Sequence, residues 1–319
     1  MKRLWHVREL STVAILVLEI MFFGWYLWPD GNRAHPFLNA ENALLILKYS
    51  SIYGIAAVGA AVVIISGGID LAPGSIIALA SVVCGVLFVD AGWGLGPSLL
   101  VSLLVGVASG ALSAVLIVTV KLPPFIATLG VMGITRGLAF IITEGRYFDL
   151  SSKLSGGWRP LGLPADWVAP LVMIGLAIVF QILMTRFQWG RQIFSIGGNE
   201  TAALFSGVAV GRIKTSVYLL SGLLAAVAGV VLALVQGQGK ADLATGYELD
   251  IIASAVVGGA SLSGGRGSVM GAVLGTLIFG VLRNALPQIP GATFYDRLIV
   301  GLAVIVIVVM DQLLLKRGE

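Results

Sequence analysis

Three charged residues, Asp70, Arg136 and Asp250, lie inside or at the ends of long apolar stretches of this 319-residue sequence. A charged side chain is costly to place among apolar residues, so each is a candidate for a functional role. Two aspartates that share a proton could act as an intramembrane aspartyl protease. Asp70, however, follows Gly-Gly-Ile rather than Gly-x-Gly, and we expect the two aspartates near opposite faces of the membrane. Both points disfavour that chemistry.

Asp70 has two other interpretations. It could pair with Arg136, and the two charges could then serve as the coupling pair of an ion-coupled secondary transporter. Alternatively, its carboxylate could cap the helix that begins near Ser75, or accept a hydrogen bond from a local backbone amide. The sequence alone does not decide between these hypotheses.

Other catalytic and metal-binding patterns are missing from the sequence. His6 and His35 lie outside the apolar stretches, and Cys84 is the only cysteine, which leaves no side-chain set for a buried metal site. The segment Gly264-Gly-Arg-Gly-Ser268 lacks the Gly-Lys-Ser/Thr ending of a phosphate-binding loop. No H-E-x-x-H or G-x-S-x-G motif occurs. We therefore expect no catalytic residues, no metal and no cofactor, and no ATP hydrolysis by this chain.

The composition indicates a polytopic membrane protein of the all-α class. Hydrophobic residues make up 58% of the chain and charged residues only 11%, whereas soluble domains carry about a quarter charged residues. A helix needs about 20 apolar residues to cross the membrane. On this basis we predict ten spans, with short or broken helices in both halves, near residues 11–28, 43–65, 75–90, 98–120, 124–143, 168–186, 215–235, 249–262, 268–284 and 294–314.

The distribution of Lys and Arg predicts the orientation of the spans. Placing the N-terminus in the cytoplasm puts the larger share of these residues on the inner side. Both termini are then cytoplasmic, residues 188–214 form a cytoplasmic loop, and residues 144–167 form the main external loop. The apolar run 11–28 is too long for an ordinary signal peptide, so we expect it to be retained as a span. The net charge of +4 bears on orientation, and we expect no nucleic-acid partner.

Two Gly-rich interruptions divide apolar runs in the two halves of the chain, at 66–75 and at 256–268. Interruptions at matching places are typical of internally repeated transporters, whose pathway lies near the breaks. Pro123-Pro124 forces a further helix boundary, and Thr128 and Arg136 lie on roughly one side of the helix that follows. The predicted pathway or gate residues are Ser66, Gly67, Gly68, Asp70, Pro73, Gly74, Pro123, Pro124, Thr128, Arg136, Gly258 and Gly259.

The longest polar segment between apolar runs, residues 189–215, predicts a short helix. Gly197-Gly198 is expected to break the chain, and Asn199 to cap a helix from Glu200 to Ser206. Gly207 is expected to end that helix in a left-handed turn. So short a helix is marginal in water, which indicates that it packs against its own bundle or a soluble partner.

Four phrases resemble the membrane permease subunit of carbohydrate-uptake ABC transporters of the ribose, xylose and galactose class. They are SGGIDLAPGSIIAL (66–79), LPPFIATLGVMGITRGLAF (122–140), GRQIFSIGGNETAALFSGVAVGRIKTSVYLLSGLLAAVAG (190–229) and GYELDIIASAVVGGASLSGGRGSVMGAVLG (246–275). The resemblance implies one all-helical permease domain over residues 1–319 in a bacterial inner membrane. It also implies a second permease subunit, two cytoplasmic ABC ATPase subunits and an extracytoplasmic sugar-binding protein, besides the membrane lipid.

The same resemblance implies a function and a coupling segment. The chain would form the translocation pathway for a monosaccharide, driven by ATP hydrolysis in a separate subunit. The alternative is the ion-coupled transporter that needs no ATPase. Two departures from the family are Phe205, where a polar or basic residue is expected, and Ala72-Pro73 in place of Ser-Val. The residues expected to couple to the ATPase are Gly197, Gly198, Asn199, Glu200, Ala202, Ala203, Phe205, Gly207 and Arg212.

The sugar itself cannot be predicted from the apolar runs. They show no aromatic cage and no dense cluster of hydrogen-bonding side chains. We therefore expect weak binding along the pathway, with selectivity residing in the external binding protein.

Overall fold

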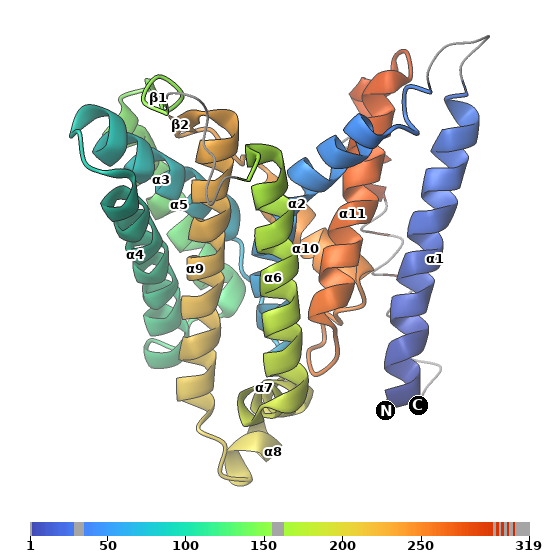
Figure 1. The fold of residues 1–319 in the computed structure, drawn as a ribbon. Coiled ribbons are helices and arrows are strands. Elements are labelled where there is room, and N and C mark those ends of the chain that lie inside the picture. Colours follow the sequence, from blue (N-terminus) through green and yellow to red (C-terminus); the bar gives the residue numbers. More distant parts are fainter. Residues whose placement is uncertain are drawn as a thin grey trace.

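A computed structural model describes residues 2–28, 35–154 and 163–295, with a few single positions beyond 295. The described chain is mostly helical (Figure 1). Its α-helices are α1 (Lys2–Tyr26), α2 (Ala40–Ile65), α3 (Pro73–Gly85), α4 (Leu95–Ala114), α5 (Pro124–Thr143), α6 (Ala165–Arg186), α7 (Gln188–Gly198), α8 (Glu200–Phe205), α9 (Val210–Gln236), α10 (Tyr247–Val257) and α11 (Val269–Ala285). Short π-helical turns at Val86–Asp90 and Val115–Thr119 extend α3 and α4, and 3₁₀ turns at Leu286–Gln288 and Ala292–Tyr295 follow α11.

Seven of these helical segments are long and apolar enough to cross a membrane. They correspond to the spans predicted near 43–65, 75–90, 98–120, 124–143, 168–186, 215–235 and 268–284. The apolar part of α1, Leu10–Tyr26, is shorter. The predicted span 294–314 lies mostly outside the described residues. The prediction of ten spans is therefore not confirmed.

The span predicted at 249–262 is wrong. Helix α10 contains 11 residues and ends at Val257, because the chain turns at Gly258 and enters a left-handed conformation at Gly259 (φ 95°). Eleven helical residues rise only about 16 Å, roughly half of the hydrocarbon thickness. The apolar composition of this run reflects burial inside the protein rather than a full crossing.

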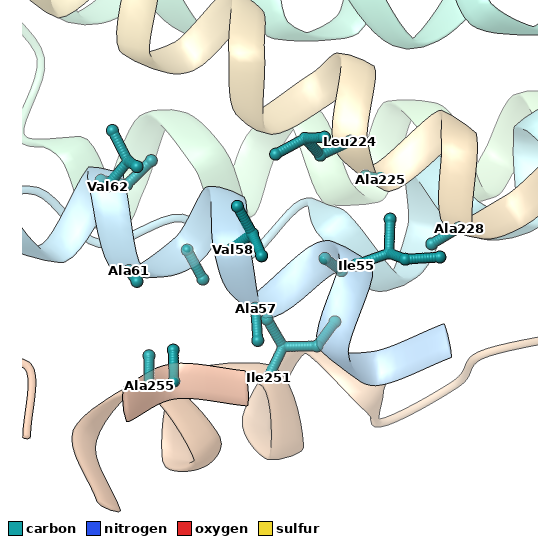
Figure 2. Packing of buried hydrophobic residues seen from close by; sticks show 14 of the residues in the cluster. Ile55, Ala57, Val58, Ala61, Val62, Leu224, Ala225, Ala228, Ile251 and Ala255 are labelled. Atoms are coloured by element: carbon teal, nitrogen blue, oxygen red, sulfur yellow. The ribbon is translucent and has the colours of Figure 1, made fainter. Parts of the chain in front are cut away.

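Helix α2 forms the centre of the core. In the most apolar stretch of α2, 83% of the residues are buried, whereas the corresponding shares are 28% in α5 and 33% in α6. Its apolar residues surround the helix on all sides, which is the pattern of a helix enclosed by other helices. Figure 2 shows one side of α2 facing Leu224, Ala225 and Ala228 of α9, while Ile251 and Ala255 of α10 lie on another side. The outer helices leave apolar surface for lipid or a partner.

A two-stranded antiparallel sheet is the one departure from a purely helical fold in the described residues. Strand β1 (Tyr147–Asp149) pairs with β2 (Gln238–Lys240), with Phe148 opposite Gly239. The sheet joins the loop after α5 to the loop after α9. It lies at the end of the molecule opposite α8 (Figure 1).

Candidate coupling and translocation site

The first predicted break is present between α2 and α3. Helix α2 ends at Ile65, Gly67 adopts a left-handed conformation (φ 84°), and α3 begins at Pro73, whose missing amide hydrogen is not needed in a first helical turn. Five of the seven intervening residues, 66–72, are buried. Non-helical backbone at membrane depth must find hydrogen-bond partners within the protein, because lipid provides none.

Side chains from three elements supply those partners. The Asp70 carboxylate accepts hydrogen bonds from the Ala72 amide (2.9 Å) and from the Ser221 hydroxyl of α9 (2.7 Å). The Thr128 hydroxyl of α5 accepts one from the Leu71 amide (3.1 Å). The expectation that Asp70 binds a local backbone amide is confirmed. This break is a buried, hydrogen-bonded structure that ties α3 to α5 and α9.

Arg136 does not pair with Asp70. Its guanidinium donates to the carbonyl oxygens of Ala241 and Leu243, both at 2.7 Å, in the loop between β2 and α10. Arg136 lies two helical turns beyond Thr128, about 12 Å along α5, and so reaches a different level of the bundle. The hypothesis of an Asp70–Arg136 coupling pair therefore has no support in the described contacts.

Asp250 likewise has a partner of its own. It forms an ion pair with Arg283 of α11, with 2.8 Å between Oδ2 and Nη2. The two aspartates thus engage different helices. A protease in which Asp70 and Asp250 share a proton is not supported by these contacts.

The second predicted break separates α10 from α11. Ser268 caps α11, its hydroxyl accepting from the Gly271 amide (3.1 Å), and the Ser261 amide donates to the carbonyl oxygen of Arg266 (3.0 Å). Gly258 and Gly271 lie so close that a Cβ on either would overlap the other's carbonyl oxygen. Helices α10 and α11 therefore form a tight hairpin around this break.

The polar segment after α6 is more helical than predicted. Gly197 and Gly198 do not break the chain, since α7 continues through both of them and ends at Gly198, with Asn199 as its C-cap. The short helix α8 follows as expected, with the Asn199 side chain accepting from the Ala202 amide (2.9 Å) and Gly207 left-handed at φ 82°. It ends at Phe205, one residue before the predicted end.

Helix α8 projects from one end of the bundle (Figure 1). Phe205 is 85% exposed and Leu204 is 59% exposed, whereas Ala203 is 1% exposed. An ion pair between Glu200 and Lys214 (2.6 Å) joins α8 to α9. Ala203 thus supports the helix from inside, and the apolar surface available to a partner consists of Leu204 and Phe205.

Three Gly-rich segments meet at the C-terminal end of α7, the helix that precedes α8. We call this point the glycine junction, and it consists of Gly67, Gly197, Gly264 and Gly265. The Gly265 amide donates to the carbonyl oxygen of Ile65 (2.9 Å). A Cβ on Gly264 would lie 2.6 Å from the carbonyl oxygen of Gly197 and 3.0 Å from Cα of Gly67. A Cβ on Gly197 would overlap the same Ile65 oxygen, whereas one on Gly198 would contact nothing within 4 Å.

The junction joins the predicted coupling segment to both predicted breaks without an intervening side chain. Gly264 and Gly265 are not among the predicted site residues, although the Gly-Gly pairs at 67–68, 197–198 and 264–265 are visible in the sequence. Of the predicted pathway residues, Thr128 and Asp70 meet at the first break, Gly68 lies against the Tyr218 hydroxyl, and Gly74 lies against Glu248 of α10. Pro123 and Pro124 open α5, and Arg212 is exposed in the first turn of α9.

Long apolar helices interrupted by two Gly-rich breaks are typical of transport proteins. The chain belongs to the family described as branched-chain amino acid transport system / permease component, which matches residues 42–309. No solved structure matches the chain.

Three of the similar proteins are permeases whose names state the sugar that they transport. The ribose import permease protein RbsC of Escherichia coli (strain K12) is 33% identical over 316 residues, which cover 97% of this chain and 94% of that protein. The fructose import permease protein FrcC of Rhizobium meliloti is 33% identical over 330 residues, covering 99% and 89%. The D-allose transport system permease protein AlsC of Escherichia coli (strain K12) is 32% identical over 311 residues, covering 96% and 92%. The predicted resemblance to carbohydrate-importer permeases is confirmed.

Proposed function

We propose that this chain is the membrane-spanning subunit of a bacterial ABC importer and forms the translocation pathway for a monosaccharide. The observation that carries the proposal is the glycine junction, at which α7, the helix that precedes the exposed helix α8, contacts both breaks. The similar permeases of ribose, fructose and D-allose support a pentose or hexose as the substrate class.

The junction provides a mechanism for coupling. An ATPase subunit that binds Leu204 and Phe205 would displace α8 as it hydrolyses ATP, and α7 would carry that displacement to Gly197. At Gly197 the backbones of three segments touch, so no side-chain rotamer can absorb the movement, and close-packed interiors transmit strain. The ends of α2 and of the α10–α11 hairpin would then shift together and alternate access to the pathway.

The proposed assembly is the one that the similarity to ABC importer permeases implies. Two cytoplasmic ATPase subunits, a second permease subunit and an extracytoplasmic sugar-binding protein complete it. Helices α5 and α6 leave most of their apolar surface uncovered, which suits lipid or the second permease. The first residues of α1 lie toward the same end of the molecule as α8, which supports a cytoplasmic N-terminus if α8 binds the ATPase (Figure 1).

Substitution of Phe205 tests the proposal. In the complex co-expressed with its ATPase and binding protein, Phe205→Ala should weaken retention of the ATPase subunit and lower sugar uptake, while the permease itself stays folded because this side chain is 85% exposed. Thr201→Ala, an exposed change on the same helix, is the matched control. Normal ATPase retention and uptake in the Phe205 variant would contradict the assignment of α8.

The ion-coupled alternative is tested by the isolated chain. Its proposed charge pair is not formed, since Arg136 and Asp70 have other partners. Purified permease in liposomes, without ATPase, should show no sugar uptake under an imposed proton or sodium gradient. Gradient-driven uptake would favour the alternative over the importer.

A further inference from the structure

A cavity of about 450 Å³ lies at the end of the bundle away from α8, between the first turns of α2, the N-terminus of α10 and the C-terminus of α11. Pockets for small molecules range from about 300 to 1,000 Å³. Because Gly280, the first residue of α11 that lines the cavity, lies 11 residues after Val269, roughly 17 Å of helix separates this cavity from the start of α11 at the hairpin. In Figure 1 the ends of α2 and α11 that form it lie at the opposite end of the molecule from α8.

One wall of the cavity is a polar group of side chains centred on Arg283. The guanidinium donates to the Tyr53 hydroxyl (2.5 Å) and to the Asp250 carboxylate (2.8 Å), so its positive charge is balanced by a neighbouring negative charge. An anionic or cationic ligand would have to compete with this ion pair. The wall therefore suits a neutral ligand.

The same wall contains amide and hydroxyl groups with unused hydrogen-bonding capacity. Asn284 donates to Asn42 (2.8 Å), and Gln288 donates to Asn284 (3.1 Å). The side-chain amide oxygen (Oε1) of Gln288 and the hydroxyl of Ser50 have no hydrogen-bond partner among the described residues. Ser50 is 1% exposed. Buried polar atoms are normally paired, so an unpaired donor and acceptor at one cavity point to a polar ligand.

Aromatic rings lie beside this wall, among aliphatic side chains of the lining. Tyr53 of α2 and Tyr247 of α10 stack with ring centroids 4.2 Å apart, and Tyr49, which is 50% exposed, lies at the opening. A sugar presents hydroxyls that both donate and accept, together with apolar C–H faces. Planar polar side chains and tyrosine faces in one cavity match both properties.

We propose that this cavity is a monosaccharide-binding site at the outer end of the pathway, where a sugar released by the external binding protein first contacts the permease. The proposal rests on the proposed importer function, and it names the residues that would contact the substrate. The sequence did not predict the site because its lining residues come from four distant stretches, at 45–53, 232, 247 and 280–288.

Transport by the assembled importer tests the site. With D-ribose, D-fructose and D-allose as probes, Gln288→Ala and Ser50→Ala should lower uptake by about tenfold or more, because a site built to hydrogen-bond its substrate loses specific contacts. ATP hydrolysis stimulated by the binding protein should persist, which shows that the variants fold and assemble. The matched control is Gln236→Ala, an exposed glutamine at the end of α9 outside the cavity.

The outcomes separate the two proposals. If the unsubstituted complex moves none of the sugars, the proposed function fails. If it moves one of them and both variants move it equally well, the cavity proposal is overturned.

A direct binding measurement uses Tyr49→Cys at the opening of the cavity. The native Cys84 is buried and should not compete for a maleimide reagent. A transported sugar at high concentration should slow labelling of the purified complex, whereas L-leucine should not, since its two charges find no unpaired partner in the described lining. Protection by L-leucine alone, or by neither compound, would contradict the proposal.

Discussion

The two breaks solve the same physical problem in different ways. The first, between α2 and α3, is filled by side-chain hydrogen bonds from Asp70, Thr128 and Ser221. The second, between α10 and α11, also has a side-chain cap at Ser268, but its two helices pack through glycine backbones in contact, as at Gly258 and Gly271. A polar network fixes one geometry, because every displaced partner leaves a buried group unpaired. When two helices in contact through glycines shift slightly past each other, no buried polar group is left unpaired.

From this difference we infer that the two breaks have separate roles in transport. We interpret the first as the fixed part of the pathway, held by α5 and α9, and the second as the part that moves. The glycine junction lies where the two meet, because Gly265 of the second break donates to Ile65 at the start of the first. Substitutions in the first break should therefore change stability, and substitutions in the second should change transport.

The largest effect is expected for Asp70→Ala. This change leaves the Ala72 amide and the Ser221 hydroxyl unpaired in a buried site, and each unpaired group costs about 1–3 kcal/mol. We expect loss of most folded permease from the membrane. The measurement is the yield and thermal stability of the detergent-extracted protein. Asp70→Asn keeps one acceptor and should lose less, and full stability of the alanine variant would remove the distinction between the breaks.

A smaller effect on stability but a large one on transport is expected for Gly264→Ala. The new methyl group would press against Gly197 and Gly67 at the junction. Gly145→Ala is a close control, since Gly145 has nearly the same backbone angle (φ 78° against 79°) and open space around it. Both variants carry the same left-handed strain of about 1–2 kcal/mol. Sugar uptake by the assembled complex should fall only in the Gly264 variant, and equal uptake in the two would show that the junction contact is dispensable.

The smallest effect is expected for Ser221→Ala in the first break. Asp70 loses one of its two hydrogen bonds but keeps the Ala72 amide, so the cost should be about 1–2 kcal/mol. Thermal unfolding of the extracted permease measures it. We expect a lowered midpoint with nearly normal uptake per folded molecule. A stable protein with impaired uptake would instead place Ser221 in the moving part.

Local features of this fold could be predicted from the sequence, and distant contacts could not. Asn199 as a cap and Gly207 as a left-handed stop depend on chemistry within a few residues, and both are confirmed. Gly197-Gly198 was predicted to break the chain, because glycine disfavours helix by about 1 kcal/mol per residue. The helix persists there because Gly197 is needed for close approach to Ile65, a requirement set by segments far away in the chain.

The same limit applies to Arg136 and to α10. The partners of Arg136 are backbone carbonyl groups, which no residue pattern identifies. The apolar run 249–262 was predicted as a short span, but packing against α11 rather than lipid explains its composition. Apolar character alone does not distinguish a helix buried in protein from one that faces the bilayer.

The central claim is that α8 acts on both breaks through the glycine junction, and the most direct test is the number of sugar molecules moved per ATP hydrolysed in Gly197→Ala and Gly198→Ala complexes. The two glycines are neighbours in α7, and a Cβ added to Gly197 would overlap Ile65 and Gly265, whereas one added to Gly198 would meet no atom within 4 Å. An overpacking cost of about 1–3 kcal/mol should lower this ratio about tenfold or more in the Gly197 variant while hydrolysis continues. The Gly198 variant should keep the unsubstituted ratio. An unchanged ratio in the Gly197 variant, or an equal loss in both, would contradict the account.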